Sequence, residues 1–171
     1  RKLKLAMDHD LAIYSAHLPL DMHPELGNNA LLVAALGFAG EGRPFAPWKG
    51  RDIGLRVSCD LDRDDLLARV ATAVGDSPKL APGGPGRVRE LGVITGGAGS
   101  QIHELAATGI DTFLTGEGPH WSYTAAEELG VNLIYAGHYA TETFGVKALA
   151  ARWARDFPGL EVGFIDHPTG L

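Results

Sequence analysis

The sequence contains a single cysteine, Cys59, and this scarcity limits what can hold the fold together. One thiol cannot form an internal disulfide, and a chain without disulfides fits the reducing environment of the cytoplasm. Cys59 ends the strand-like run 53–59, a setting that favours a buried and unreactive thiol. We therefore expect a cytoplasmic protein without disulfide bonds.

Long apolar runs and basic segments are also missing. No stretch approaches the roughly 18 consecutive apolar residues that read as a membrane-spanning helix. The 15 Lys and Arg residues against 21 Asp and Glu residues give a formal net charge of −6, and no basic run is interleaved with aromatic side chains. We therefore expect neither a membrane nor a nucleic acid as a partner.

The 171 residues do contain enough apolar side chains, 45% of the total, for a sizeable core. In the second half of the chain, short apolar runs alternate with helical patterns. Strands are expected at 91–95, 112–114, 131–135 and 160–165, and helices at 101–108, 120–129 and 141–156. This alternation favours an α/β layer built from βαβ units.

The first half is less regular. Strands are expected at 11–17 and 53–59, helices at 28–36 and 62–74, a proline-punctuated loop at 18–25, and a surface excursion at 38–52. The acidic cluster that opens the helix at 62 consists of Asp60, Asp62, Asp64 and Asp65. Because the helix macrodipole favours negative charge in the first turn, we interpret this cluster as a helix start, not as a metal site.

Domain boundaries follow from composition. Residues 77–86 are rich in proline and glycine and form the best linker candidate. Residues 1–9 resemble the end of a helix without a start signal. We therefore predict a partial first lobe at 1–76, truncated at its N-terminus, a linker at 77–87, and a second α/β lobe at 88–171.

The most informative stretch is Tyr-Ala-Gly-His-Tyr-Ala-Thr-Glu at residues 135–142. His138 and Glu142 are four residues apart, so a helix beginning near them would place both side chains on one face. Imidazole and carboxylate together suit zinc, iron, manganese or nickel. A solvated surface pair has the same spacing and stays open as an alternative. Position favours the site, since the pair follows an apolar strand, where α/β proteins bind ligands.

A glycine turn, Gly-Gly-Ala-Gly-Ser at residues 96–100, follows another expected strand. Backbone N–H groups of Gly97, Gly99 and Ser100 at a helix start could bind a phosphate. The turn lacks the Gly-Lys-Ser/Thr ending of a P-loop and the spacing of a dinucleotide fingerprint. A turn that merely requires positive φ is the alternative.

The third such loop is Thr-Gly-Glu-Gly-Pro at residues 115–119. Glu117 and the following His120 offer an acid and a base for proton transfer. His120 stands next to Trp121 and could equally be a packed residue at a helix start. The carboxyl ends of successive strands in an open α/β sheet meet at one crevice, so the three loops are expected to converge.

Taken in order, the motifs resemble those of the Nif-three-like dinuclear metal-centre family, whose bacterial members are also called GTP cyclohydrolase type 2 homologues. They are His-Leu-Pro-Leu-Asp at 17–21 with Gly-Asn-Asn at 27–29, the loops at 96–100 and 115–117, Gly-His-Tyr-Ala-Thr-Glu at 137–142 and Phe-Ile-Asp-His-Pro at 164–168. The resemblance covers essentially the whole chain.

This resemblance implies two α/β lobes with mixed sheets flanked by helices, two divalent metal ions in the cleft between them, and commonly a toroidal homohexamer. Matched by motif, Asp21 is the carboxylate ligand of the first lobe, and His138 and Glu142 are ligands from the last strand–helix junction. The family also uses two adjacent histidines upstream of the equivalent of Arg1. No His-His pair occurs in this sequence, so either the chain is a fragment, which its abrupt start favours, or its metal site is incomplete.

The chemistry of a two-metal site agrees with these residues. Two cations close together need bridging anions, and Asp21 and Glu142 can supply them. His17 is expected to support Asp21. Such a site can lower the pKa of a bridging water and polarise a phosphate oxygen.

Two functions remain. One is a metal-dependent hydrolase of a phosphorylated or nucleotide-like substrate, in which Glu117 or His120 moves protons. The other is a non-catalytic metal-binding oligomer that stores, delivers or senses metal or serves as an interaction platform.

Overall fold

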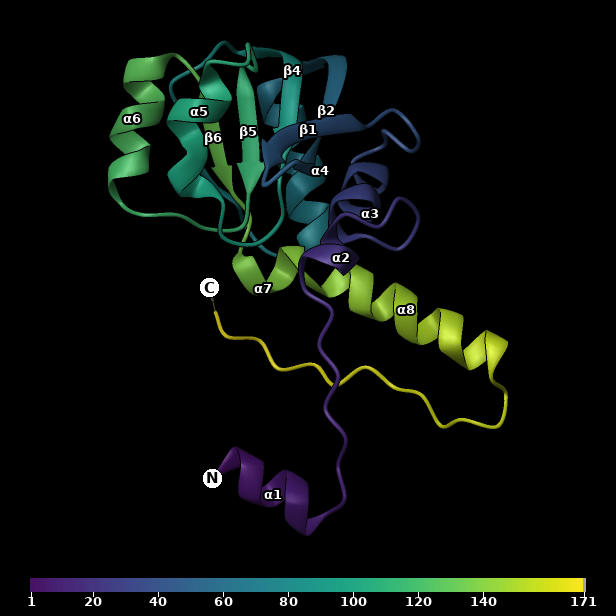
Figure 1. The fold of residues 1–171 in the computed structure, drawn as a ribbon. Coiled ribbons are helices and arrows are strands. Elements are labelled where there is room, and N and C mark those ends of the chain that lie inside the picture. The colour runs from purple at the N-terminus through teal and green to yellow at the C-terminus, as the bar shows by residue number, and fades with distance from the viewer. Residues whose placement is uncertain (171) are drawn as a thin grey trace.

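The centre of the protein is one six-stranded mixed sheet, seen in a computed structural model that describes residues 1–170 (Figure 1). Its strands are β1 (Arg43–Trp48), β2 (Arg51–Asp62), β3 (Lys79–Pro82), β4 (Arg87–Val93), β5 (Thr112–Thr115) and β6 (Asn132–Tyr135). They are arranged in the order β1-β2-β4-β5-β6-β3. β4, β5 and β6 run parallel, and the other neighbouring pairs are antiparallel. The predicted α/β class with helices flanking a mixed sheet is confirmed.

Helices cover both faces of this sheet (Figure 1). The helices are α1 (Lys2–Asp8), α2 (Leu18–Asp21), α3 (Asn28–Ala35), α4 (Arg63–Val74), the 3-10 helix η1 (Gly99–Gln101), α5 (Ile102–Ala106), α6 (Trp121–Leu129), α7 (His138–Thr141) and α8 (Thr143–Asp156). Of these, α1 lies away from the sheet on the N-terminal arm (Figure 1). One core joins the sheet to α5 and α6, and the other joins it to α3 and α4. None of the helices among residues 1–170 has the length and apolarity needed to cross a bilayer.

Strand β5 shows how the sequence separates these two cores. Phe113 belongs to the core beneath α5 and α6, and Leu114 to the core beneath α3 and α4. Successive side chains of a strand point to opposite faces, and here both faces are covered. The continuous apolar run is therefore buried along its whole length.

The acidic cluster at the start of α4 acts as a helix start. The Asp62 carboxylate accepts a hydrogen bond from the backbone N–H of Asp64 at 2.9 Å, and Asp64 and Asp65 occupy the first turn. Asp60 lies outside the helix, where the Arg87 guanidinium donates to it at 2.6 Å. The helix-start interpretation is confirmed for Asp62, Asp64 and Asp65, whereas Asp60 lies in β2 and pairs with Arg87.

Three segments predicted as loops contain regular structure. Residues 18–25 include α2, residues 38–52 include β1, and residues 77–86 include β3. β1 and β3 lie at the two edges of the sheet, where a proline's missing N–H faces away from any partner strand. The proline-rich composition that indicated loops is therefore compatible with edge strands.

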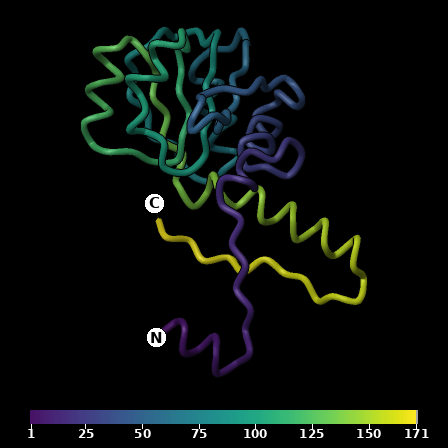
Figure 2. The backbone as a smooth tube through the Cα atoms, in the orientation of Figure 1, coloured from purple at the N-terminus to yellow at the C-terminus, as the bar shows by residue number. Residues whose placement is uncertain are grey.

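Two predicted strands are absent from the structure. Residues 11–17 form an exposed connection, in which Tyr14 is 84% exposed, and residues 160–165 are also without regular structure. Figure 2 shows both segments as arms that leave the body of the protein on the same side. A strand needs a hydrogen-bonding partner, and no strand of residues 1–170 pairs with either segment.

The predicted linker does not separate two sheets. β2, from the predicted first lobe, pairs with β4, from the predicted second lobe, over six register positions from Leu55↔Val93 to Asp62↔Arg87. The strands of both segments thus share one sheet. The arrangement in two lobes with a cleft between them stays a prediction.

Candidate metal centre

Three loops converge at the carboxyl ends of the parallel strands. The N–H of Gly116, after β5, donates to the carbonyl of Gly96, after β4, at 2.8 Å. The N–H of Gly137, after β6, donates in turn to the carbonyl of Gly116 at 3.0 Å. The hydroxyl of Thr141 accepts from the N–H of Gly96 at 3.0 Å. The expected crevice is thus held together by backbone hydrogen bonds.

His138 is the first residue of α7, and its ring lies between two carboxylates. Its Nδ1 atom is 2.7 Å from a carboxylate oxygen of Glu117, and its Nε2 atom is 3.3 Å from a carboxylate oxygen of Glu142. Burial alone would lower the pKa of His138, but the hydrogen bond to Glu117 and the charges of both glutamates outweigh it and raise the pKa. The predicted one-face relation of His138 and Glu142 is present.

Two side chains from the first part of the chain join Glu142. Ligand atoms of His17, Asp21 and Glu142 all lie within 4.8 Å of one another, and Asp21 is buried. His17 precedes α2 and Asp21 ends it, so this short helix delivers both. His17 was expected from the sequence only to support Asp21, whereas the structure gives it the position of a possible ligand.

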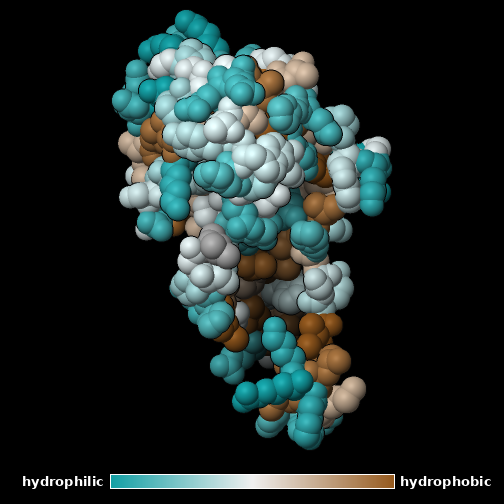
Figure 3. All heavy atoms as spheres, turned by 90° about the vertical axis from the view of Figure 1, so that its left-hand side faces the viewer, coloured by the Kyte–Doolittle hydropathy of each residue, from teal (hydrophilic) through white to brown (hydrophobic). Residues whose placement is uncertain are grey.

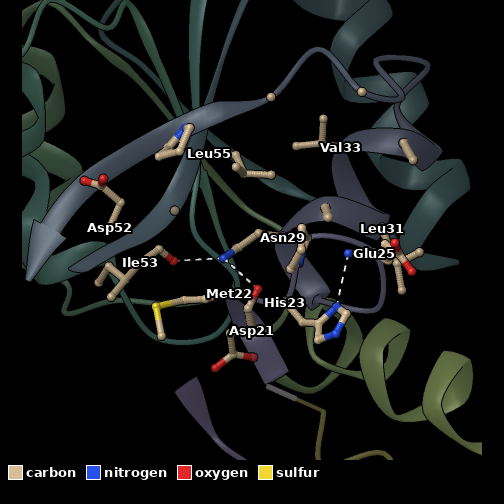
Figure 4. A pocket seen from close by; sticks show the side chains of 17 residues that line it. Asp21, Met22, His23, Glu25, Asn29, Leu31, Val33, Asp52, Ile53 and Leu55 are labelled. Carbon is tan, nitrogen blue, oxygen red and sulfur yellow. Dashed lines mark hydrogen bonds between the residues drawn. The ribbon is translucent and has the colours of Figure 1, made fainter. Parts of the chain in front are cut away.

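Asn28 fixes the distance between α2 and α8. Its side-chain amide donates to the Asp21 carboxylate at 2.6 Å, and its side-chain oxygen accepts from the N–H of Gly145 at 2.6 Å. One buried side chain therefore joins the helix that carries Asp21 to the helix that follows Glu142. Asn29 adds a second tie, because it donates to the backbone oxygens of Asp21 and Ile53, as the dashed lines in Figure 4 show.

The carboxylates at this point repel each other. Burial is the largest cause that raises the pKa of Glu142, the charge of Asp21 raises it further, and the charge of His138 acts in the opposite direction. A cation bound among these groups would offset both the cost of burying the charged carboxylates and the repulsion between them. One or two imidazole nitrogens with two carboxylates also form a donor set that zinc, iron, manganese or nickel accepts. The residues therefore fit a divalent metal.

The possible metal ligands line a cavity of about 340 Å³, together with Trp48 and Gly97. They are His17, Asp21, His138 and Glu142. A neighbouring cavity of about 440 Å³ lies between α3 and the β1–β2 hairpin (Figure 4). Figure 4 shows the Asp21 carboxylate pointing away from the apolar Val33 and Leu55 of this second cavity. The possible metal ligands therefore face the smaller cavity.

The predicted phosphate-binding glycine turn is only partly available to a ligand. Gly97 lines the smaller cavity, but the N–H of Gly99 donates to the backbone carbonyl of Glu117 at 3.1 Å. Ser100 lies exposed in η1. The phosphate-binding role of the three residues stays a prediction.

The two predicted proton-transfer residues have different positions. Glu117 contacts His138, as described above. His120 is exposed just before α6, and it is not among the residues that line the smaller cavity. Its neighbour Trp121 stacks on His103, with ring centroids 5.9 Å apart. A catalytic role for either residue stays a prediction.

Sequence reasoning missed Asn28 as a positioning residue and Trp48 as a lining residue. Asn28 lies in the Gly-Asn-Asn motif, which was used above only as part of the family resemblance. Trp48 precedes Lys-Gly at 49–50, a two-residue hairpin loop with positive φ at both positions. The glycine and the flanking apolar residues could have indicated that hairpin.

A mixed α/β sheet with imidazole and carboxylate groups gathered at the carboxyl ends of its parallel strands defines an α/β protein with a candidate metal site. The sequence model of the Duf34/NIF3 (NGG1p interacting factor 3) family matches residues 1–170, and the chain belongs to this family. The resemblance drawn from the motifs is confirmed.

Known relatives agree with this membership. The chain is 41% identical over 172 residues to a protein of Deinococcus radiodurans named GTP cyclohydrolase 1 type 2 homolog, covering 99% of this chain and 65% of that protein. A protein of the same name from Halobacterium salinarum is 41% identical over 177 residues, covering 99% and 68%. The crystal structure of TTHA1606 from Thermus thermophilus has 37% identity and a TM-score of 0.82, covering 99% and 66%. The chain thus spans about two thirds of the length of these relatives.

Proposed function

We propose that this protein binds divalent metal ions in a dinuclear centre and hydrolyses a phosphorylated or nucleotide-like substrate there. The observation that carries the proposal is the convergence of His17, Asp21 and Glu142 within 4.8 Å from two distant parts of the chain. Glu142 also approaches His138, at 3.3 Å. Because Glu142 belongs to both groups, His17, Asp21, His138 and Glu142 are the residues that would hold the ions.

When bound, such ions act as Lewis acids that polarise a phosphate or carbonyl oxygen. The chain's own residues orient and shield the site. Glu117 accepts a hydrogen bond from Nδ1 of His138 and thereby leaves Nε2 facing the cavity as a ligand atom. Asn28 keeps Asp21 at the distance from α8 that the site requires. Glu117 therefore acts through His138. His120, which is exposed outside the smaller cavity, is the proposed proton carrier.

Metal content tests this proposal directly. Glu142→Gln keeps the shape of the side chain but removes a charge from between the ions, so we expect most of the bound metal to be lost. Glu25→Gln is the matched control, because Glu25 is an exposed carboxylate outside the smaller cavity. Elemental analysis of the parent and both variants measures the effect. Equal occupancy in all three proteins would refute the role of Glu142.

Turnover separates the two function classes. Release of phosphate from a nucleotide, or hydrolytic opening of its base ring, dependent on added zinc, manganese, iron or nickel, would support the hydrolase. A protein that retains metal but turns over no phosphoester and no nucleotide would instead be the non-catalytic metal-binding oligomer.

Self-association, most simply as the homohexamer implied by the family resemblance, is the proposed assembly. Apolar side chains are exposed on the N-terminal arm, among them Leu3, Met7 and Ile13, and Figure 3 shows brown apolar atoms mixed with teal ones toward the narrow lower end of the molecule. Such exposed apolar groups favour an interface between copies. Light scattering measures the mass, and a monodisperse monomer would contradict this assembly.

A further inference from the structure

The β1–β2 hairpin ends in a tight turn beside the proposed metal centre. Trp48 and Arg51 form its last register pair, and Lys49 and Gly50 make the two-residue loop with φ values of 48° and 79°. Positive φ at both loop positions is the signature of a type I′ turn, which matches the twist of the strands. Such a φ is unfavourable for a lysine, and strained residues of this kind concentrate at ligand-binding positions.

The turn places Trp48 in the wall of the 340 Å³ cavity that also contains His138 and Glu142. The base of the hairpin is fixed, because Phe45 and Ile53 are buried in the core. The Trp48 side chain itself is not packed away, since the residue is 43% exposed. An indole held by a rigid hairpin at the edge of a small cavity presents a flat apolar surface without a large loss of conformational freedom on binding.

Two cations accompany this indole. The Lys49 ammonium lies 4.3 Å from the centroid of the Trp48 ring. Neither Lys49 nor Arg51 forms an ion pair with any of residues 1–170, in a chain whose net charge is −6. Lys49 and Arg51 therefore place positive charge on the hairpin next to Trp48, whereas the lining of the cavity includes Asp21 and Glu142. Positive charge next to Trp48 attracts an anionic ligand toward this side of the site.

We infer that Trp48 stacks on a planar heteroaromatic ring of the substrate, and that Lys49 and Arg51 attract a phosphate of the same molecule. The inference rests on the proposed function and narrows its substrate class to nucleotides or closely similar phosphorylated heterocycles. The ring is recognised by stacking, which every base permits and which needs no hydrogen-bonding partner. A cavity of about 340 Å³ lies within the size range of small-molecule sites.

An exposed tryptophan can also be the centre of an interface between copies of the chain. The position of Trp48 in the cavity wall and the absence of ion pairs at Lys49 and Arg51 within residues 1–170 favour a small anionic ligand. The experiment has to distinguish a small ligand at Trp48 from a second copy of the chain, and the chain offers a matched control. Trp153 on α8 has the same 43% exposure and does not line the cavity.

Guanosine 5′-monophosphate and ribose 5-phosphate are the two probes, because they share the phosphate and differ in the ring. The Trp121→Phe/Trp153→Phe variant leaves Trp48 as the only one of the three tryptophans, so its fluorescence reports on this site alone. We expect the nucleotide to quench this fluorescence and the sugar phosphate to leave it unchanged. By isothermal titration calorimetry, Trp48→Ala should weaken nucleotide binding roughly 5- to 150-fold, the range found for single stacking contacts. Trp48→Phe should keep most of the affinity, and Trp153→Ala should change nothing.

The proposal is wrong if the parent binds both probes equally or binds neither, or if Trp48→Ala and Trp153→Ala behave alike. It is also wrong if Trp48→Ala lowers the mass measured by light scattering, since Trp48 would then be an interface residue. Elemental analysis of the same samples keeps the two proposals apart. Parent protein that prefers the nucleotide but contains no metal contradicts the proposed function alone. Parent protein that contains metal but shows no preference for the ring contradicts only the inference about Trp48.

Discussion

The Nδ1 atom of His138 lies 2.7 Å from a carboxylate oxygen of Glu117, although Glu117 follows β5 and His138 begins α7 after β6. This contact determines which ring nitrogen of His138 faces the cavity. With Nδ1 engaged by Glu117, Nε2 is directed to the side where Glu142 lies. The orientation of a histidine ligand by a carboxylate on its other nitrogen is a common device of metal sites, and its loss lowers metal affinity.

Removal of the Glu117 carboxylate should therefore weaken metal binding without removing a ligand. For Glu117→Ala we expect an affinity lower by about 10- to 100-fold, the usual effect of losing such a partner. Competition with a chelator measures the affinity, and the nitrogen NMR shifts of His138 report its tautomer. Glu128→Ala is the control, because Glu128 is an exposed glutamate on α6. If the two alanine variants hold metal equally well, Glu117 does not position His138.

Gly96 and Gly75 allow backbone strain to be separated from damage to the site. Both have φ of 74°, so alanine at either position should destabilise the fold by about 1 to 2 kcal/mol. A methyl group at Gly75 meets nothing within 4 Å, whereas one at Gly96 would collide with the Glu142 carboxylate and lie 3.2 Å from Nε2 of His138. Urea unfolding in the presence of a chelator should show similar losses for both variants. Only Gly96→Ala should also lose metal by elemental analysis, and metal retained at the parent level would contradict the site geometry.

Cys59 should react slowly with alkylating reagents. Burial is the largest cause that raises the pKa of its thiol from 9.0 to about 11, and the charges of Asp111, Glu90 and Asp60 raise it further. At pH 8 the thiolate should therefore be about 100-fold scarcer in the folded protein than in the unfolded chain. The rate of iodoacetamide alkylation should rise about tenfold per pH unit up to about pH 10, whereas in urea it should level off near pH 9.

The same shift has a consequence for stability. The folded state holds the thiol proton more tightly than the unfolded state does. The resulting contribution of Cys59 to the stability of the fold is therefore complete below about pH 9 and is lost as the pH rises toward 11. A folded-state alkylation rate that levels off near pH 9 would contradict the shifted pKa.

The sequence was most informative where local chemistry decides the structure. The Asp62 cap and the acidic first turn identified the start of α4 correctly, because capping involves only residues within one turn. The buried strand β5 was predicted from its apolar run. The proline-containing strands β1 and β3 were missed, and strands were wrongly predicted at 11–17 and 160–165. Strand formation depends on a partner that local sequence does not specify.

The candidate site shows the same difference between features that local sequence decides and features that depend on distant residues. His138 and Glu142 could be paired from their spacing, because the i,i+4 relation is a property of the helix itself. Asp21 was assigned only through the family resemblance, and His17 was expected only to support it. The positions of Asn28 and Trp48 around Asp21 could not be assigned at all.

By itself, then, the sequence determined the α/β class, the helix starts and the histidine–carboxylate pair at the end of β6. The tertiary structure alone decided that α2 meets α8 through Asn28, and that a hairpin turn places Trp48 in the wall of the same cavity. The physical reason is the range of the interactions. Capping, periodicity and turn chemistry act over a few residues, whereas a site assembled from residues 17–21, 48 and 138–142 depends on how the sheet and its helices pack as a whole.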